Sequence, residues 1–394
     1  MSGAEKAGKN FKIALIAGDG IGPEVTAEAR KAADAAASSD GAKLEWSAFP
    51  FGAAHYLSSG EILPKSSLSE LAEFDALMLG AIGAPSVKPG ILERGILLEL
   101  RFAFDQYINL RPARSLPNVP TPVPLGGRVM DSVVIRENTE DLYMGLGGVS
   151  SSADGLFETR LDLKRGGYTL AGELKLSVSP GMSFAVQAAL NTRHGVERIT
   201  RYACETAGRR GETRVTIVTK SNAAPALYGY FEDTAKQVID SEYPGIKYDV
   251  VNVDALCYHL VRDPLAYGVL LCPNLFGDIV SDLQAGLAGG LGTAAGGNIG
   301  DGLSMFEPVH GSAPDIAGTG RANPIAAVLS GALMLRHIGL ENAALNVERA
   351  VGDYLEHSPR AELPFEFGGG AACSEVGGSI LKKLQEGDNG EFRS

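Results

Sequence analysis

The sequence contains little that would mark a secreted, membrane-bound or nucleic-acid-binding protein. Only four cysteines occur among 394 residues, and they are far apart with no C-x-x-C pair. No stretch approaches the roughly 20 apolar residues that a membrane-spanning helix needs. Residues 1–10 are polar and contain lysine, which is not typical of an apolar signal segment. We therefore expect a reduced, cytoplasmic protein with no membrane partner.

Basic residues are also too few for a nucleic-acid-binding surface. The chain has 35 Lys and Arg against 47 Asp and Glu, which gives a formal net charge of −12. Because nucleic acids require a basic face, we expect no such partner. A small anionic substrate stays compatible with this charge, since a few local arginines can outweigh a distant acidic surface. The hydrophobic content of 45% allows an ordinary soluble core, and the length suffices for two large domains.

Short apolar runs alternate with helical patterns along most of the chain. This alternation predicts an α/β fold with a largely parallel sheet and helices on its faces. Pro23 begins one predicted helix, and Asn323-Pro324 begins another that ends near His337. Residues 286–302 are dense in glycine and are predicted to be a loop, whereas 146–180 resemble a β-arm. The predicted strands are 11–16, 44–49, 75–79, 132–136, 215–219, 247–253 and 268–271.

Two aspartates, Asp278 and Asp282, are four residues apart. In a helix both carboxylates leave the same face, one turn apart, where they repel unless a cation lies between them. Carboxylate oxygens suit hard cations such as Mg²⁺ or Mn²⁺. Asp254 follows a predicted strand and could complete the site. The alternative for Asp254 and for Asp278 is a helix N-cap.

Other polar residues lie near predicted strand ends. Arg101, Arg111 and Arg136 could hold a dicarboxylate, because the guanidinium fork matches a carboxylate; the alternative for each is a surface salt bridge. Lys220 follows a strand at its carboxyl end, where α/β sheets bind ligands. Lys220 or Tyr143 could act as a general acid or base, or each could be structural.

Two glycine-containing segments could approach a dinucleotide. Residues 18–23 follow the first strand, but their spacing is not G-x-G-x-x-G, and a tight turn with positive φ at glycine is an equal alternative. In residues 307–316, backbone amides could approach phosphates, and Asp315 could accept hydrogen bonds from ribose hydroxyls, favouring NAD over NADP. Asn323 could contact adenine or cap a helix. The predicted cofactor residues are Glu307, His310, Gly311, Ser312, Ala313, Asp315, Ile316 and Asn323.

The ordered set of these segments resembles the metal-dependent β-decarboxylating dehydrogenases, a family that includes 3-isopropylmalate, isocitrate, homoisocitrate and tartrate dehydrogenases. The matching segments cover nearly the whole chain: IAGDGIGPE (16–24), NLRP (109–112), RENTE (136–140), NLFGD (274–278) and HGSAPDIAG (310–318). The resemblance implies an isopropylmalate dehydrogenase-like two-domain α/β fold with a mixed, largely parallel sheet and helices on both faces. Residues 1–106 with 290–394 would bind the cofactor. Residues 107–289 would bind substrate and metal, with an arm at about 146–180 for dimerisation.

The resemblance also implies residue roles. Arg101, Arg111 and Arg136 would hold the malate carboxylates of the substrate, and Asp278 and Asp282 would bind Mg²⁺ or Mn²⁺. Asp254 and Lys220 would reach the same site from the partner subunit of a homodimer with shared active sites. Lys220 would help to remove the hydroxyl proton, and the hydride at C2 would pass to NAD⁺. The metal would polarise the new ketone, and Tyr143 would protonate the enolate left after CO₂ departs.

The substrate's side group depends on residues before Arg101. Members that act on isocitrate have a serine and an asparagine six and four residues before this arginine, whereas Gly95 and Leu97 stand here. Leu97 and Leu98 resemble the isopropyl pocket of 3-isopropylmalate dehydrogenases, since an apolar wall leaves an extra carboxylate unpaired. We therefore expect conversion of 3-isopropylmalate to 4-methyl-2-oxopentanoate and CO₂, as in leucine biosynthesis.

Alternatives stay open at this point. Residues 136–143 are closer to the isocitrate, homoisocitrate and tartrate branches, so another 3-substituted malate in a specialised pathway is the second interpretation. A third is a non-catalytic regulatory subunit of the same fold. Such a subunit should lack a metal aspartate, the lysine or the tyrosine, and all of them are present.

Overall fold

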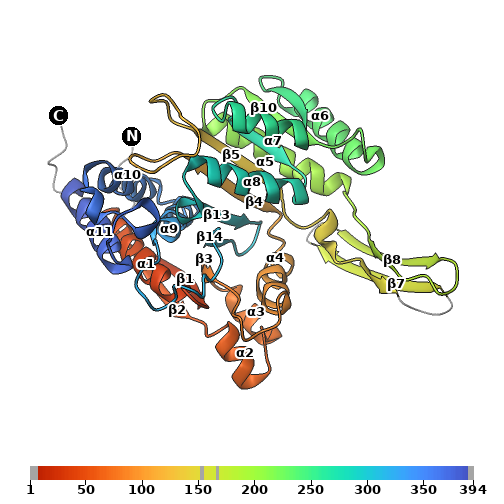
Figure 1. Cartoon of the computed structure of the whole chain (residues 1–394), viewed down its shortest axis with the longest axis horizontal. Helices are drawn as coiled ribbons and strands as arrows, with labels where there is room; N and C mark the ends of the chain where they lie inside the picture. Colours follow the sequence, from red (N-terminus) through yellow and green to blue (C-terminus); the bar gives the residue numbers. More distant parts are fainter. Residues whose placement is uncertain (1–7, 151–154, 166–167, 389–394) are drawn as a thin grey trace. The chain divides into compact units, whose positions relative to one another are not determined.

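The computed structural model describes residues 8–150, 155–165 and 168–388 (Figure 1). Contacts divide the chain into two compact units. The first contains residues 1–133 and 281–394, and the second contains residues 134–280. The first unit is thus assembled from both ends of the chain. This division falls at 133/134 and 280/281, whereas the boundaries inferred from the sequence are 106/107 and 289/290.

The first unit contains a mixed sheet in the order β4-β13-β14-β3-β1-β2. β1 runs parallel to β2 and β3, and β14 runs parallel to β3, whereas β13 is antiparallel to both β14 and β4. The antiparallel strand makes the sheet mixed, as predicted. The strands are β1 (Lys9–Gly18), β2 (Ala42–Ala48), β3 (Ala76–Ala81), β4 (Ile108–Arg114), β13 (Ala295–Ile299) and β14 (Met305–Pro308).

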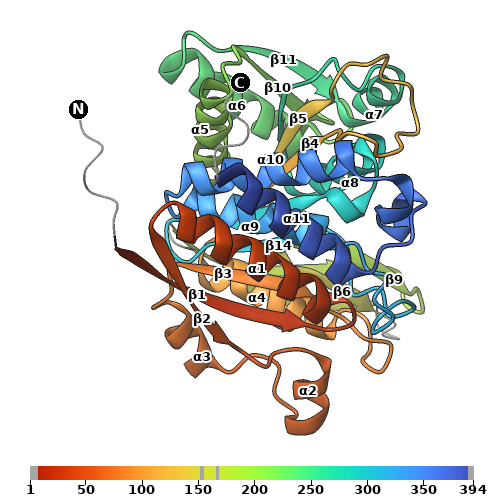
Figure 2. The same cartoon turned by 90° about the vertical axis from the view of Figure 1, so that its left-hand side faces the viewer.

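Helices cover both faces of this sheet. Successive side chains of a strand point to opposite faces, so the apolar strands present apolar side chains on both faces. On one face, Ala14 and Ile16 of β1 pack in a core with three residues from a later segment. These are Leu92, just before the π-helix η1, Ile96 in η1, and Leu100 in helix α4. Helix α1 contacts the same strands and packs on α9 and α11 (Figure 2). The helices are α1 (Gly22–Ser39), α2 (Ala53–Ser59), α3 (Lys65–Leu71), η1 (Glu93–Leu98), α4 (Glu99–Ala103), α9 (Ile325–His337), α10 (Glu341–His357) and α11 (Cys373–Asp388).

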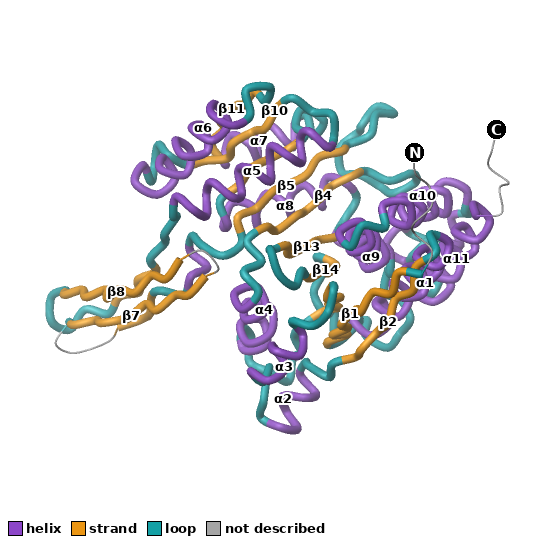
Figure 3. The backbone as a smooth tube through the Cα atoms, turned by 180° about the vertical axis from the view of Figure 1, so that it is seen from behind, coloured by secondary structure: helices purple, strands orange, loops and turns teal. Residues whose placement is uncertain are grey.

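The second unit contains strands in the order β11-β10-β12-β5, and β10 is parallel to both β11 and β12. Helices pack around these strands, as the tube view shows (Figure 3). Strand β5 and helix α8 both run through the boundary between the units. The elements are β5 (Asp131–Glu137), β10 (Arg214–Thr219), β11 (Lys247–Asn252), β12 (Val269–Cys272), α5 (Arg193–Arg209), α6 (Tyr230–Glu242), α7 (Val253–Arg262) and α8 (Asn274–Ala288).

The second unit contains a β-arm at the predicted residues 146–180, and a fourth strand, beyond this range, pairs with its first. β7 (Leu156–Arg165) and β8 (Tyr168–Ser177) make an antiparallel hairpin, and β6 (Gly147–Ser150) pairs with β9 (Phe184–Gln187). Phe157 of β7 packs edge-on against Phe184 of β9, with ring centroids 5.8 Å apart. A two-stranded hairpin is marginal by itself in water, so this packing supports it.

The seven strands predicted from the sequence are confirmed, each within a few residues, but the loop predicted at 286–302 is wrong. That segment contains the end of α8, the 3₁₀ turn η4 (Leu291–Thr293) and strand β13. Its glycines permit close packing. A Cβ on Gly297 would lie 3.1 Å from the Phe306 ring, and one on Gly296 would lie 3.1 Å from Nε of Arg111.

The four cysteines are free thiols, and three of them are buried. Across residues 8–150, 155–165 and 168–388, no helix is both long and apolar enough to cross a membrane.

Candidate active site

Asp278 lies at the centre of a polar cluster in the second unit. Arg136, at the end of β5, is 1% exposed and reaches toward helix α8. Its NH1 donates to Oδ1 of Asp278 at 2.5 Å, and its Nε donates to the carbonyl of Asn274 at 2.8 Å. The hydroxyl of Tyr143 donates to the other oxygen of Asp278, also at 2.5 Å. Three predicted site residues therefore meet at one carboxylate.

Helix α8 presents this carboxylate from within its first turns. Asp278 is the fifth residue of the helix, so the N-cap alternative for it is wrong. Asp282 follows one turn later on the same helix and is exposed. Gly277 lets the helix approach Arg136, because a Cβ at this position would lie 2.4 Å from Cγ of Arg136. Gly277 is therefore required for the close packing that brings Asp278 to Arg136.

Tyr143 is a partly buried phenol beside Asp278. It lies in the short turn η2 (Leu142–Met144) and is half-buried. Burial is the main cause that raises the pKa of its phenol, and the hydrogen bond to Asp278 raises it further. Arg136 acts in the opposite direction, with its guanidinium 5.1 Å from the ring centroid. The phenol therefore keeps its proton at neutral pH.

Lys220 and Asp254 form a separate pair in the second unit. Lys220 follows β10 at the carboxyl end, as predicted, and its Nζ lies 2.5 Å from Oδ1 of Asp254. The hydrogen bond from Lys220 is the main cause that lowers the pKa of Asp254. Asp254 is in the first turn of α7, whose N-cap is Asn252, so the N-cap interpretation of Asp254 is also wrong.

The two aspartates of α8 have the chemistry to hold a divalent metal. Asp278 and Asp282 supply carboxylate oxygens, the ligands that Mg²⁺ and Mn²⁺ prefer. Among the residues that the structure describes, no group of three or more Asp, Glu, His or Cys side chains could hold a metal ion. Asp278 and Asp282 are therefore a pair of carboxylates, and Mg²⁺ is commonly held by one or two carboxylates with water as the other ligands.

Two buried acids, Glu137 and Glu140, follow Arg136 in the sequence, and no role was predicted for them. Glu137 is 1% exposed and accepts hydrogen bonds from the amides of Thr139 and Glu140, each at 2.8 Å. Burial, with repulsion from Glu140, raises the pKa of Glu137 to about 7. Glu140 accepts from the hydroxyls of Tyr168 on the arm and Thr192, each at 2.6 Å. The repeated acids of RENTE are the available sequence signal for this arrangement.

In the first unit, Arg101 and Arg111 are both buried. Arg101 lies 3.4 Å from Oε1 of Glu307, and Nε of Arg111 donates to Oδ1 of Asn109 at 2.7 Å. The surface salt-bridge alternative is therefore wrong for these two arginines. It is also wrong for Arg136, whose side chain is 2% exposed.

The residues before Arg101 form a π-helical turn, η1, which sequence periodicity does not reveal. Leu97 is partly buried against the core, and Leu98 is half-exposed. A Cβ on Gly95 would lie 2.7 Å from Cγ2 of Ile62. A larger side chain at position 95 would therefore have to displace Ile62.

A pocket of about 330 Å³ in the first unit includes part of the predicted cofactor loop. Gly311, Ser312 and Pro314 form one wall, and the segment from Ile82 to Glu93 forms the other. The turn after β1 braces both walls. Asp19 accepts from the amide of Gly83 at 2.9 Å, and the amide of Ile21 donates to the carbonyl of Ser312 at 2.9 Å. Positive φ at Gly18 and Gly20 confirms the tight-turn interpretation.

The remaining predicted cofactor residues differ in whether their polar atoms already have hydrogen-bond partners within the protein. His310 has an Nε2 atom that is buried without a hydrogen-bond partner, and burial lowers the pKa of its ring. Asp315 is exposed, Ala313 has a φ of +41°, and the amide of Ile316 donates to the carbonyl of Ala313. The carboxamide of Asn323 accepts from the amide of Ile325 at 3.1 Å and donates to Glu366 at 2.9 Å. The buried, partnerless nitrogen of His310 fits a bound cofactor, whereas Asn323 is already engaged at the start of α9.

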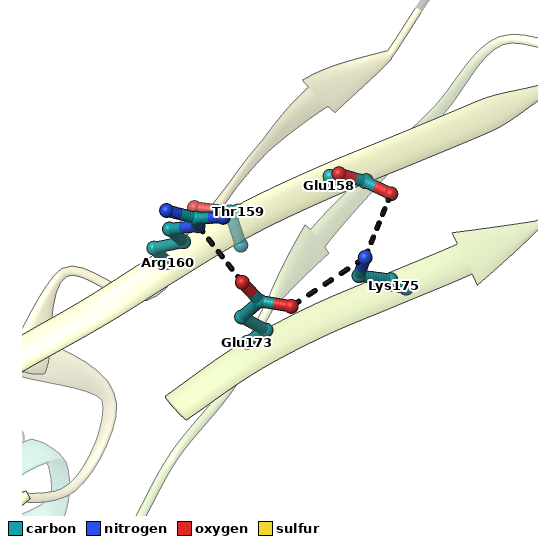
Figure 4. A pocket seen from close by; sticks show the side chains of 5 residues that line it. All are labelled: Glu158, Thr159, Arg160, Glu173 and Lys175. Atoms are coloured by element: carbon teal, nitrogen blue, oxygen red, sulfur yellow. Dashed lines mark ion pairs between the residues drawn. The ribbon is translucent and has the colours of Figure 1, made fainter. Parts of the chain in front are cut away.

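A second pocket, of about 340 Å³, lies on the charged face of the arm (Figure 4). Its side chains pair with one another: Arg160 with Glu173 at 2.9 Å, and Lys175 with Glu158 at 3.2 Å and Glu173 at 3.4 Å. These groups are well exposed, and exposed pairs contribute little energy. The pocket is therefore lined by solvent-exposed ion pairs between β7 and β8.

Comparison with known proteins defines the class to which this site belongs. The isocitrate/isopropylmalate dehydrogenase family matches residues 12–380. A 3-isopropylmalate dehydrogenase of Clavibacter sepedonicus is 43% identical over 386 residues, covering 95% of this chain and 98% of the relative. One of Streptomyces coelicolor is 42% identical over 379 residues, covering 95% and 99%. The chain therefore belongs to the isocitrate/isopropylmalate dehydrogenase family.

A solved structure extends the likeness to the fold. The isocitrate dehydrogenase of Methylococcus capsulatus superimposes with a TM-score of 0.78 at 36% identity, covering 95% of this chain and 99% of that one. The relatives named here thus include both an isocitrate enzyme and isopropylmalate enzymes. The side group of the substrate has to be argued from the residues near Arg101.

Proposed function

We propose that the protein catalyses the NAD- and divalent-metal-dependent oxidative decarboxylation of 3-isopropylmalate to 4-methyl-2-oxopentanoate and CO₂, the leucine-biosynthetic reaction. The observation that carries the proposal is the meeting of Arg136 and Tyr143 at the carboxylate of Asp278. A cationic group for a substrate carboxylate, a proton donor and a metal-type ligand there lie within one hydrogen-bonded cluster. Arg101, Arg111 and Arg136 bind the two substrate carboxylates in this proposal.

Two protons have to move, and the chain offers one group for each. Lys220 takes the proton of the substrate hydroxyl as C2 is oxidised, and Tyr143 donates a proton to the enolate carbon after CO₂ leaves. NAD⁺ supplies the hydride acceptor, and a divalent ion held by Asp278, Asp282 and the partner subunit's Asp254 supplies positive charge to the reacting oxygens. The raised pKa of Tyr143 keeps its proton available until the enolate forms.

The apolar residues before Arg101 favour an alkyl side group over a carboxylate. Leu97 and Leu98 offer no donor to a third carboxylate, which would be left unpaired at a high cost. A serine at position 95, as in the isocitrate branch, would meet Ile62. Both features support 3-isopropylmalate rather than isocitrate.

An assay of several 3-substituted malates tests this choice. Formation of NADH from NAD⁺ is measured with Mg²⁺ and 3-isopropylmalate, isocitrate, homoisocitrate or tartrate. We expect kcat/KM for 3-isopropylmalate to exceed that for isocitrate by at least roughly 100-fold. The third carboxylate of isocitrate would be buried against the leucines without a partner. Turnover of isocitrate without turnover of 3-isopropylmalate would reject the pocket argument.

Asp315 and His310 support NAD as the dinucleotide. A carboxylate at the ribose repels a 2′-phosphate, and the neutral imidazole of His310 leaves a ring nitrogen to pair with a base. We expect Asp315→Arg to lower kcat/KM for NAD⁺ by about tenfold and to raise that for NADP⁺. Glu375→Arg, at an exposed acid outside the loop, is the matched control. An unchanged ratio of NAD⁺ to NADP⁺ use would remove Asp315 from the cofactor site.

We also propose a cytoplasmic homodimer with shared active sites. Apolar side chains stay exposed on the second unit, with Tyr258 59% and Ile279 51% accessible on α7 and α8. Asp254 and Asp278 would then serve one site from two chains. Inactive Asp254→Asn and Asp278→Asn proteins, unfolded and refolded together, should regain up to about a quarter of the activity, because a heterodimer would retain one intact site. No recovery despite formation of heterodimers would contradict the shared site.

A further inference from the structure

A row of hydrogen bonds joins the two buried arginines of the first unit. Arg111 Nε donates to Asn109 Oδ1, Asn109 Nδ2 donates to Asn298 Oδ1, and Asn298 Nδ2 donates to Glu307 Oε1, each at 2.7 Å. Arg101 NH2 donates to the same oxygen of Glu307 at 3.4 Å. We call Asn109, Asn298 and Glu307 the amide relay. It connects residues that are up to 206 positions apart in the sequence.

Strand register places the relay. Asn109 of β4 and Asn298 of β13 stand directly opposite each other in an antiparallel pair, and Glu307 lies on the next strand, β14. Opposite residues of an antiparallel pair are close enough for their side chains to bond. A slip of either strand by one residue would turn its asparagine to the other face of the sheet and separate the pair. The relay therefore depends on three neighbouring strands (Figure 1).

The chemistry of the two ends fixes the direction of the relay. Arginine has donors only, so Asn109 must present its oxygen to Arg111 and its nitrogen to Asn298. Asn298 must then present its nitrogen to Glu307, whose carboxylate accepts from it and from Arg101. Each amide has one orientation that satisfies both neighbours. The asparagines are 0% exposed and Glu307 is 7% exposed, so a broken link would leave a buried polar group unpaired.

We propose that Asn109, Asn298 and Glu307 are positioning residues, which fix the spacing and direction of the Arg101 and Arg111 guanidinium groups for a dicarboxylate. The proposal rests on the proposed function, in which these arginines bind the substrate. It also gives Glu307 a role in substrate binding instead of the cofactor contact predicted from the sequence. Arginine forks bind carboxylates through two directed bonds, so a small displacement weakens both.

Asn298→Leu tests the relay, because leucine has a similar volume and neither bonds to Asn109 nor donates to Glu307. Malate is the probe, since its two carboxylates do not depend on the identity of the 3-substituent. We expect the dissociation constant for malate, measured by calorimetry with Mg²⁺ present, to rise about 10- to 100-fold. The dissociation constant for NADH should change by less than about threefold.

Tyr354→Phe is the control for a merely structural effect. Tyr354 is 0% exposed, and its hydroxyl donates to the carbonyl of Glu362 at 2.7 Å in the same unit without touching the relay. We expect this variant to lower Tm, as Asn298→Leu does, while leaving malate binding unchanged. Unchanged malate binding in Asn298→Leu would overturn the proposal, and so would a loss confined to NADH binding.

Glu307→Gln is the second variant if Asn298→Leu fails to fold. It keeps the size of the side chain and one acceptor oxygen but removes the charge that faces Arg101. We expect malate binding to weaken about tenfold with NADH binding retained; retention of both would overturn the proposal. A protein that binds malate through the relay but turns over no 3-substituted malate would refute the proposed function alone.

Discussion

The arginines of the two units lie in contrasting surroundings. Arg101 and Arg111 are joined through two buried amides and a carboxylate, all within the first unit. Arg136 is as deeply buried, but its guanidinium reaches Asp278, whose side chain is 41% exposed. The first pair is held by the protein interior. Arg136 instead bonds to a carboxylate that is partly exposed to solvent.

This difference in exposure affects how easily the hydrogen bonds of each arginine can change. Hydrogen bonds between buried groups keep a fixed geometry, because breaking them leaves unpaired donors and acceptors. A cation or ligand can replace one of the hydrogen bonds that the half-exposed carboxylate of Asp278 accepts. The free-energy cost is lower than for a buried group, since water can take the place of the lost donor. In the proposed mechanism, Arg101 and Arg111 would orient the substrate's charges, whereas Asp278 and Tyr143 would change partners or transfer protons.

The largest expected effect comes from Asp278→Asn. The substitution removes the negative charge of the proposed metal ligand and replaces one of the two oxygens that accept from Arg136 and Tyr143. We expect kcat to fall at least about 100-fold, because loss of a charged catalytic partner costs several kcal/mol. The measurement is NADH formation at several Mg²⁺ concentrations. Asp249→Asn, at an exposed acid paired with Arg214, is the control and should remain active.

Tyr143→Phe should affect turnover without a comparable loss of binding. Removal of a general acid typically lowers the rate by 10²–10⁴, so we expect kcat to fall about 100-fold with KM changed less than about threefold. Tyr228→Phe, which removes a buried hydroxyl bonded to Asp141 in the same unit, is the matched control. Equal losses in the two variants would point to general destabilisation instead of proton donation.

Gly277→Ala tests the close approach of α8 to Arg136. The added Cβ would lie 2.4 Å from Cγ of Arg136, so the guanidinium must shift away from Asp278. We expect kcat/KM to fall about tenfold or more, since misplacement by about 1 Å is enough for such a loss. Gly286→Ala adds the same group on the same helix, where nothing lies within 4 Å, and should retain activity. Full activity in Gly277→Ala would show that the Arg136–Asp278 contact is not needed.

The smallest effect concerns stability and pH. The folded protein holds a proton on Glu137 up to about pH 7, whereas the unfolded chain releases it near pH 4.5. The folded state therefore binds more protons in this window, and the free energy of unfolding should fall as pH rises from about 4.5 to 7, by on the order of 3 kcal/mol at most. Glu137→Gln should flatten this slope in denaturant titrations. If Glu137→Gln keeps the wild-type slope, other titrating groups cause the pH dependence of the free energy of unfolding.

Much of the fold followed from local patterns. The runs that gave β1, β3, β5 and β10 are apolar and bounded by turn residues, so their strands could be read without tertiary information. Strand β13 was missed because two of its five residues, Gly296 and Gly297, are glycines and more glycines flank it, a composition that usually indicates a loop. Only the contacts of Gly296 and Gly297 with Arg111 and Phe306 explain why that strand needs them.

The site was predicted as residue types and not as bonds. The four-residue spacing of Asp278 and Asp282 indicated a cation site, and α8 confirmed that they lie one turn apart. The sequence could not indicate that Tyr143 and Arg136 both bond to Asp278, because these pairs are 135 and 142 residues apart. The amide relay was missed for the same reason. Asn109 and Asn298 look unremarkable until strand register places them opposite each other.

A direct test of the contrast is the binding of Mn²⁺, followed by the loss of its free-ion electron paramagnetic resonance signal, in the wild-type protein and in Asp278→Asn. The account predicts one saturable site per chain in the wild type, and at least a tenfold weaker site in the variant, because one of few carboxylate ligands is lost. Equal affinity and stoichiometry in the two proteins would contradict the assignment of Asp278 as a metal ligand.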